Sequence, residues 1–148
     1  MSQNIYYAYE EFRVDLKNLT KRINKPFDTI LGISRGGLTM AHMLGEYYDI
    51  RKVYAINSIG YEGMVKLDSL KVYNVPDLSD VKHLLIVDDI SDSGDTLVEV
   101  EQVLREKYPH VTIYTATLFY KPTSKYKPTW WVKEPKGWID FFWSEDLR

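Results

Sequence analysis

Two neighbouring carboxylates and a group of small polar residues stand together near the middle of the chain. Asp88 and Asp89 follow the apolar run at 84–87, and the polar stretch at 91–96 leads into a segment with helical spacing. Hydroxyl groups and the unpaired backbone N–H groups at the start of a helix attract anions such as phosphate. The two carboxylates would repel a phosphate, but they suit vicinal sugar hydroxyls or a hard cation such as Mg²⁺. The stretch therefore favours a ribose 5-phosphate as its ligand.

The expected ribose-phosphate site lies in the loop between this strand and the helix. Its hydroxyls are hydrogen-bond donors, and Gly94 allows a phosphate to approach the backbone closely. Asp95 adds a negative charge beside the expected phosphate, so it either turns outward or caps the helix. An acidic turn that only caps its helix is the structural alternative for the same pattern. The residues assigned to the site are Asp88, Asp89, Ser91, Asp92, Ser93, Gly94, Asp95 and Thr96.

A second loop with the chemistry of an anion site follows an earlier apolar run. Residues 29–33 predict a strand and residues 38–47 predict a helix, so the loop between them again joins a strand end to a helix start. Its glycines free the backbone, and its arginine supplies a forked positive charge. A glycine-rich turn with a solvent-exposed arginine explains this loop in isolation. Two anion sites on neighbouring parallel strands, however, suit a substrate with phosphates at both ends. The loop residues are Ser34, Arg35, Gly36 and Gly37.

Strand and helix patterns alternate along the chain, which predicts an α/β fold with a mostly parallel central sheet flanked by helices. Residues 58–72 predict a hairpin, with a tip at about 61–68 that is either a mobile lid or a plain flexible turn. The aromatic tail at 129–143 is expected in the core or a subunit interface, with one ring left to stack on a planar base. The other expected strands are 53–57, 84–87 and 111–119, and the other expected helices are 6–23 and 96–108.

Composition limits the class of protein. The 148 residues suit one domain over 1–148 with a real core. The net charge of −2 and the scattered basic residues give no sign of a nucleic-acid partner. There is no cysteine for a disulfide or a thiolate metal site, and no apolar run of the ~20 residues that an integral membrane segment needs. The first residues lack the form of a signal peptide, so we expect a cytoplasmic protein.

Together these motifs resemble the type I phosphoribosyltransferases, in particular the bacterial xanthine-guanine (6-oxopurine) phosphoribosyltransferases. The run from Leu84 to Thr96 has the order of that family's signature, with an apolar strand, two acids and a small polar turn. The resemblance implies a flexible lid hairpin at about 58–72 and a small C-terminal base-binding hood at about 121–148. The other matching pieces are Ser34-Arg35-Gly36-Gly37, Lys121-Pro122 and Trp138-Ile139-Asp140.

The resemblance also implies a role for each site. The loop at 34–37 would bind pyrophosphate and contain a cis peptide bond at Ser34–Arg35. Asp89 would lie on the Mg²⁺ side of the ribose, and Asp92 would be the general base for the imidazole proton of the purine. In the family, a lysine after the late strand meets the purine 6-oxo group, and a tryptophan-isoleucine pair stacks on the ring and offers backbone groups to its 2-position. The corresponding residues here are Lys121, Trp138 and Ile139.

The lid region departs from the family pattern. The family's lid commonly carries a Ser-Tyr pair, and this chain has Gly60-Tyr61 there. Close relatives place an arginine shortly before a Leu-Lys-Val strand. This chain has residues 67–69 of sequence Leu-Asp-Ser at that point, with Lys66 as the nearest cation.

The function implied is purine salvage. The enzyme would transfer the phosphoribosyl group of phosphoribosyl pyrophosphate to guanine, xanthine or hypoxanthine, with Mg²⁺, giving the nucleoside monophosphate and pyrophosphate. The family also implies a homotetramer. A regulator that keeps this fold and binds nucleotides without turnover is the alternative, although it would need a basic nucleic-acid-binding face. A receiver-type signalling domain fits less well, because receivers carry their acidic pair after the first strand.

Overall fold

The computed structural model describes residues 3–62 and 65–148. Its elements alternate between strand and helix over most of the chain, as the sequence predicts. In chain order they are β1 (Asn4–Tyr7), α1 (Tyr9–Arg22), β2 (Thr29–Ser34), α2 (Leu38–Tyr48), β3 (Val53–Glu62), β4 (Val65–Tyr73), β5 (His83–Ser91), α3 (Asp95–Lys107), β6 (Thr112–Tyr120), β7 (Trp138–Phe141) and α4 (Phe142–Glu145).

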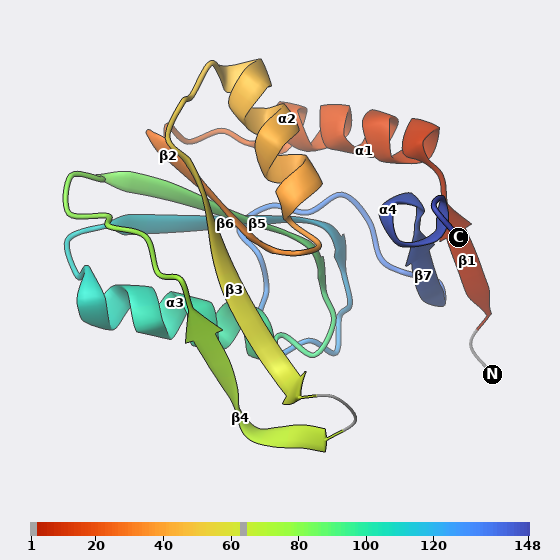
Figure 1. Cartoon of the computed structure of the whole chain (residues 1–148). Helices are drawn as coiled ribbons and strands as arrows, with labels where there is room; N and C mark the ends of the chain where they lie inside the picture. Colours follow the sequence, from red (N-terminus) through yellow and green to blue (C-terminus); the bar gives the residue numbers. More distant parts are fainter. Residues whose placement is uncertain (1–2, 63–64) are drawn as a thin grey trace.

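A five-stranded sheet forms the centre of the molecule (Figure 1). Its strand order is β4-β3-β2-β5-β6, and every neighbouring pair is parallel except β3–β4. Parallel strands are covered on both faces, which is why their sequences are almost continuously apolar. The predicted mostly parallel α/β sheet is therefore confirmed.

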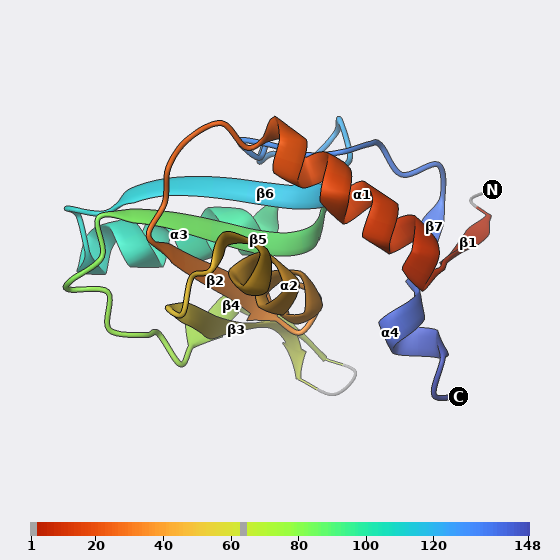
Figure 2. The ribbon, with the colours of Figure 1, turned by 90° about the horizontal axis from the view of Figure 1, so that it is seen from above.

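Strand β5, an interior strand of the sheet, shows how the sequence specifies two cores. Leu84 to Val87 are all fully buried, and alternate side chains point to opposite faces of the sheet. Leu85 and Val87 join the cluster under α1 and α2, whereas Leu84 and Ile86 join the cluster under α3. Burying each such side chain contributes roughly 1.5–3 kcal/mol. Figure 2 shows α1 and α2 on one side of the sheet and α3 on the other.

Strand β5 continues beyond the apolar run that predicts it. Its pairing with β6 extends to Ser91 opposite Tyr120. The acidic pair at 88–89 therefore lies within the strand and not in the turn that follows it. Since β2 and β6 are parallel to β5, the ends of all three strands face the same edge of the sheet.

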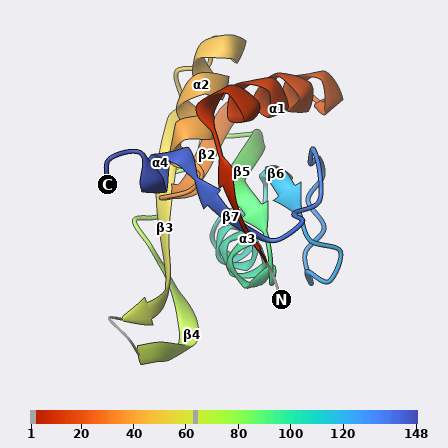
Figure 3. The same ribbon diagram turned by 90° about the vertical axis from the view of Figure 1, so that its right-hand side faces the viewer.

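The two ends of the chain meet in a second, smaller sheet. Strands β1 and β7 pair in parallel, from Asn4 opposite Trp138 to Tyr7 opposite Phe141. The helix expected over 6–23 accordingly begins only at Tyr9, because the preceding residues form β1. Figure 3 shows β1, β7 and α4 together at one end of the large sheet, where the base-binding hood is expected.

The hairpin expected over 58–72 is present as the antiparallel pair β3–β4. The register shifts between Ile59 and Tyr61, and pairing resumes at Tyr61 opposite Lys66. Residues 63 and 64, at the tip of the expected lid, lie outside the described residues. In the part of the chain that the structure describes, no helix is long and apolar enough to cross a membrane.

Candidate functional site

Two clefts meet at the carboxyl ends of β5 and β6. The smaller, of about 230 Å³, is lined by the end of β5 and the start of α3 with the loop between them, at residues 88–94, 96 and 97. The larger, of about 700 Å³, lies between this loop and the hood. Asp89 and Asp92 line both clefts, so the two spaces adjoin. The larger one also brings Lys121, Trp138 and Ile139 to the same space, although they come from two different parts of the chain.

The smaller cleft has the features of a phosphate cradle. Gly94 has φ +89° at the start of α3, a left-handed conformation that favours glycine. The backbone N–H of Asp95 donates to Ser93 Oγ at 3.2 Å. In the described chain the N–H groups of Thr96 and Leu97, which come next, are therefore those left for an anion. A Cβ at position 94 would lie 2.6 Å from Ser124 Oγ and 2.7 Å from Tyr126 N, so the segment at 124–126 packs directly against the loop.

The position of Asp95 is settled by an ion pair that the sequence did not suggest. Its Oδ1 lies 2.5 Å from Lys125 Nζ. The segment after β6 therefore offsets the negative charge that seemed out of place beside a phosphate. The same segment is tied to the loop by two backbone hydrogen bonds of 3.0 Å, from Lys121 N to Ser91 O and from Lys125 N to Ser93 O.

Asp88, which is buried, and Asp89, which is partly buried, form a pair of like charges. Burial and the neighbouring Asp89 raise the pKa of Asp88, and burial raises the pKa of Asp89 as well. The backbone N–H of Asp89 donates to Asp88 Oδ1 at 2.9 Å. These two carboxylates are costly in the ligand-free fold, whereas sugar hydroxyls or a cation would compensate them.

This cost predicts that Asp88→Asn stabilises the ligand-free protein near pH 7.5 while abolishing most turnover. A carboxyl whose pKa is higher in the folded than in the unfolded state destabilises the protein once it ionises. The loss of stability begins as the pH rises past the unfolded-state pKa, about 3.9, and is complete above the folded-state pKa. Each unit of raised pKa corresponds to about 1.4 kcal/mol, or roughly 3–6 °C in Tm for a chain of this size. Thermal unfolding between pH 4.5 and 8 measures the difference, which should shrink toward pH 4.5.

Asp28→Asn is the control of opposite sign. Burial works against ionisation of Asp28, but hydrogen bonds from His83 N (2.9 Å), Thr29 Oγ1 (2.7 Å) and Lys82 N (3.1 Å) outweigh it and lower the pKa. Its ionised form therefore adds stability above the unfolded pKa, and Asp28→Asn should lower Tm at pH 7.5. A lower Tm for Asp88→Asn at that pH would contradict the cost assigned to the acidic pair.

The loop after β2 lies against this acidic pair. The peptide bond Ser34–Arg35 is cis, as the family resemblance predicts. A Cβ on Gly36 would overlap the carboxylate of Asp89, 2.6 Å from its Cγ. A Cβ on Gly37 would meet backbone instead, with Ile33 N at 2.9 Å and Ile33 O at 3.0 Å. The two glycines are therefore needed for different reasons.

Gly36→Ala and Gly37→Ala should have different effects. At position 37 the new methyl group meets backbone that cannot move aside, and we expect a loss of about 1–3 kcal/mol, or roughly 3–10 °C in Tm. At position 36 it displaces a carboxylate, so the main effect should be weaker binding of phosphoribosyl pyrophosphate, with a smaller change in Tm. Thermal unfolding and the KM for that substrate, measured on both variants, test the distinction. Equal changes in Tm would contradict it.

The larger cleft is lined by charged side chains on one side and by an aromatic side chain from the hood on the other. Lys121 Nζ lies 3.4 Å from Asp92 Oδ1, and each side chain is about half exposed. Trp138 is 62% exposed, so its ring is accessible to a planar ligand. Three further charged residues line the cleft without a role predicted from the sequence, although the first of them ends the matching piece at 138–140. These are Asp140, Glu145 and Arg148.

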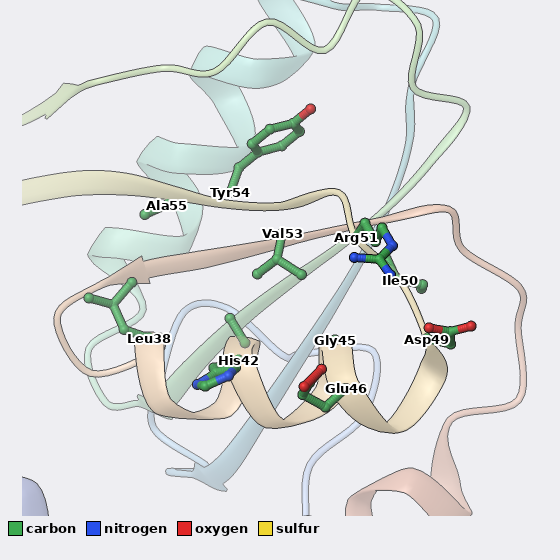
Figure 4. A pocket seen from close by; sticks show the side chains of 11 residues that line it. Leu38, His42, Gly45, Glu46, Asp49, Ile50, Arg51, Val53, Tyr54 and Ala55 are labelled. Carbon is green, nitrogen blue, oxygen red and sulfur yellow. The ribbon is translucent and has the colours of Figure 1, made fainter.

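Another hollow, of about 460 Å³, lies between α2 and β3 (Figure 4). Val53 points toward the helix, while Tyr54 points to the other side of the strand. Exposed His42 lies on its wall. None of the residues predicted to bind substrate lines this space, so it is not the candidate site.

The donor set at the acidic pair fits Mg²⁺. Within residues 3–62 and 65–148, no group of three or more His, Asp or Glu side chains could hold a metal by itself. Magnesium is usually held by one or two carboxylates together with substrate phosphates and water. Asp89, beside both the cradle and Gly36, is placed to supply one such carboxylate.

Comparisons with known proteins agree with this arrangement. The family model described as a phosphoribosyl transferase domain matches residues 2–148. The solved structure of a xanthine-guanine-hypoxanthine phosphoribosyltransferase from Helicobacter pylori is similar, with a TM-score of 0.90 and 38% identity over 98% of this chain and 96% of that one. A purine phosphoribosyltransferase from Pyrococcus horikoshii has a TM-score of 0.80 and 30% identity over 96% and 95%.

A xanthine-guanine phosphoribosyltransferase from Roseobacter denitrificans is 32% identical over 128 residues, which is 80% of this chain and 69% of that protein. The match to the family model spans almost the whole chain, and the central sheet is mostly parallel, as the sequence predicted. The chain therefore belongs to the phosphoribosyltransferase family and has its type I fold.

Proposed function

We propose that the protein is a purine salvage enzyme. It transfers the phosphoribosyl group of phosphoribosyl pyrophosphate to guanine, xanthine or hypoxanthine, and it releases the nucleoside monophosphate and pyrophosphate. The observation that carries this proposal is the larger cleft, where Lys121, Asp92 and exposed Trp138 face one space that adjoins the phosphate cradle. The names of the similar purine and xanthine-guanine enzymes support the same substrate class.

The charges of the site suit the reaction. Loss of pyrophosphate leaves a cation-like anomeric carbon and a departing polyanion. Arg35 and the backbone N–H groups of Gly36 and Gly37 would bind the leaving group, and such stabilisation of developing charge is usually the largest catalytic contribution. Asp88 and Asp89 would accept hydrogen bonds from the two ribose hydroxyls. The 5-phosphate would lie on the loop at 91–96, at the start of α3.

The purine would enter from the hood side. Trp138 would stack on its ring, and backbone groups of Trp138 and Ile139 would face its 2-position. Lys121 would donate to the 6-oxo group. Asp92 lines both clefts, so it would lie between the 5-phosphate and the base and would take the imidazole proton as the ring nitrogen attacks the anomeric carbon.

Magnesium dependence is part of the proposal. Bound Mg²⁺ would neutralise charge on the pyrophosphate and so make it a better leaving group. Asp89 would contribute a carboxylate to it, and the buried acidic pair gives that cation a reason to bind.

We also infer a homotetramer in the cytoplasm. The family resemblance, which implies a homotetramer, supports this inference. Light scattering of the purified protein would measure the assembly, and a monomer would contradict it.

The proposed function is tested with a panel of five bases. Guanine, xanthine, hypoxanthine, adenine and uracil would each be incubated with the protein, phosphoribosyl pyrophosphate and Mg²⁺, with a second set in a chelator. We expect product with one or more of the three 6-oxopurines and none without Mg²⁺. Nucleotide binding without turnover of any base would favour the regulator instead.

A further inference from the structure

A polar cluster whose inner members, Tyr7 and Asp15, are buried lies behind the hood, outside the candidate site. Tyr7 donates a hydrogen bond of 2.5 Å to Asp15 Oδ2, and both residues are nearly inaccessible to solvent. Lys133 Nζ lies 2.9 Å from the same Asp15 oxygen and 2.7 Å from Glu11 Oε2. Lys133 Nζ also lies 5.6 Å from the centre of the Tyr7 ring and 5.7 Å from that of Phe119.

The charges in this cluster are defined by their neighbours. Burial and the hydrogen bond to Asp15 raise the pKa of Tyr7 far above its ordinary value, so its hydroxyl keeps its proton. Burial acts to lower the pKa of Lys133, but Glu11 and Asp15 outweigh it and raise the pKa. Lys133 is thus a permanent cation held by two carboxylates.

The cluster joins the two parts of the base site. On one side, the backbone of Lys133 is bonded to β6, through Lys133 N to Leu118 O at 3.1 Å and Tyr120 N to Lys133 O at 3.0 Å. The strand so held ends next to Lys121. On the other side, Tyr7 belongs to β1, which pairs along its length with the strand that carries Trp138.

No strand pairing joins the hood sheet to the five-stranded sheet in the described chain. Backbone bonds hold the chain to β6 as far as Lys133, which bridges to Phe119, so beyond that point the orientation of the hood relative to β6 depends on side chains. The Tyr7 ring packs edge-on against Phe119 of β6 at 5.1 Å and against Phe141 of β7 at 5.5 Å. Apolar packing is not directional, whereas the buried Asp15 carboxylate, which accepts from the Tyr7 hydroxyl and pairs with Lys133, admits few arrangements.

We propose that Lys133 is a positioning residue for the base pocket, which fixes the distance between Lys121 and Trp138 through Asp15 and Tyr7. The inference rests on the proposed function, because it concerns the same purine site. Lys133 touches neither substrate nor the phosphate loops, so its loss should affect the base and spare phosphoribosyl pyrophosphate. A small misplacement of binding groups can cost a large factor in affinity or rate.

The test compares KM values for the two substrates. In Lys133→Met we expect the KM for guanine to rise about 10-fold, with the KM for phosphoribosyl pyrophosphate changed by less than about 2-fold. Lys133→Arg keeps both ion pairs and should restore the KM for guanine to near the wild-type value. Tyr7→Phe keeps the ring packing but removes the hydrogen bond to Asp15. It should raise the KM for guanine by a smaller factor and leave the KM for phosphoribosyl pyrophosphate unchanged. This variant tests the proposal even if Lys133→Met folds poorly.

Lys52→Met is the matched control. Lys52 makes an ion pair of 2.8 Å with Asp80, and its side chain is 42% exposed against 37% for Lys133, but it lies far from the hood along the chain and in the sheet. In Lys52→Met the KM for guanine and the KM for phosphoribosyl pyrophosphate should both stay at the wild-type level. If wild type turns over guanine but Lys133→Met and Tyr7→Phe change both KM values equally or neither, the positioning role is wrong and the proposed function stands. Wild type without turnover would overturn both.

Discussion

Asp92→Asn is expected to lower turnover about 100-fold or more, because a positioned general base contributes roughly 10²–10⁴-fold. Asparagine keeps the shape of the side chain but cannot take the imidazole proton. The phosphate cradle depends on Gly94 and the segment at 121–126, which the substitution leaves in place. The KM for phosphoribosyl pyrophosphate should therefore change little. Steady-state rates with saturating guanine measure the effect.

The pH dependence of the rate distinguishes the loss of the general base from the loss of the ion pair between Asp92 and Lys121. Removal of a general base eliminates the acidic limb of the pH–rate profile, whereas a displaced lysine would change the KM for guanine. Asp80→Asn, which removes an exposed carboxylate beside Lys52, serves as the control and should match wild type. Unchanged turnover in Asp92→Asn would remove this residue from its role.

Lys121→Met is expected to lose roughly 10- to 100-fold in kcat/KM for guanine, the value of a hydrogen bond from a charged donor. Wild type should prefer guanine over adenine by about 10⁴-fold, because adenine presents an amino donor to the lysine at the 6-position. Stacking on Trp138 is nearly the same for all purines and cannot discriminate. The variant should therefore show a much smaller guanine-to-adenine ratio.

Binding of phosphoribosyl pyrophosphate should survive this substitution, since Lys121 lines the larger cleft and not the cradle. Calorimetric titration with that substrate and Mg²⁺ provides the control. If wild-type protein used adenine as well as guanine, Lys121 would not read the 6-position, and the assignment of the base site would fail with it.

The motifs that were visible in the sequence are those built from neighbouring residues. An apolar run followed by glycine, hydroxyl and acidic residues reports both the buried strand and its loop, so the cradle at 88–96 and the loop at 34–37 could be predicted. Parallel strands then bring the two loops to one edge of the sheet without further information. The structure shows this arrangement, with Gly36 against Asp89.

Contacts between distant parts of the chain could not be predicted in this way. The pairing of β1 with β7 joins residues that are far apart in sequence, and four residues beginning at Asn4 carry too weak a pattern to distinguish a strand from the start of α1. The partner of Asp95 is similar, because Lys125 lies in a loop whose path depends on β6 and the backbone bonds behind the cradle. The cluster of Tyr7, Asp15 and Lys133 combines three such segments.

The most direct test of the central claim is phosphorus NMR of a single incubation with phosphoribosyl pyrophosphate, guanine and Mg²⁺. We predict that guanosine monophosphate and pyrophosphate appear in equal amounts as phosphoribosyl pyrophosphate disappears, and that neither appears when guanine is left out. Persistence of phosphoribosyl pyrophosphate, or its conversion to ribose 5-phosphate and pyrophosphate without nucleotide, would contradict the assignment of this cleft to purine phosphoribosyl transfer.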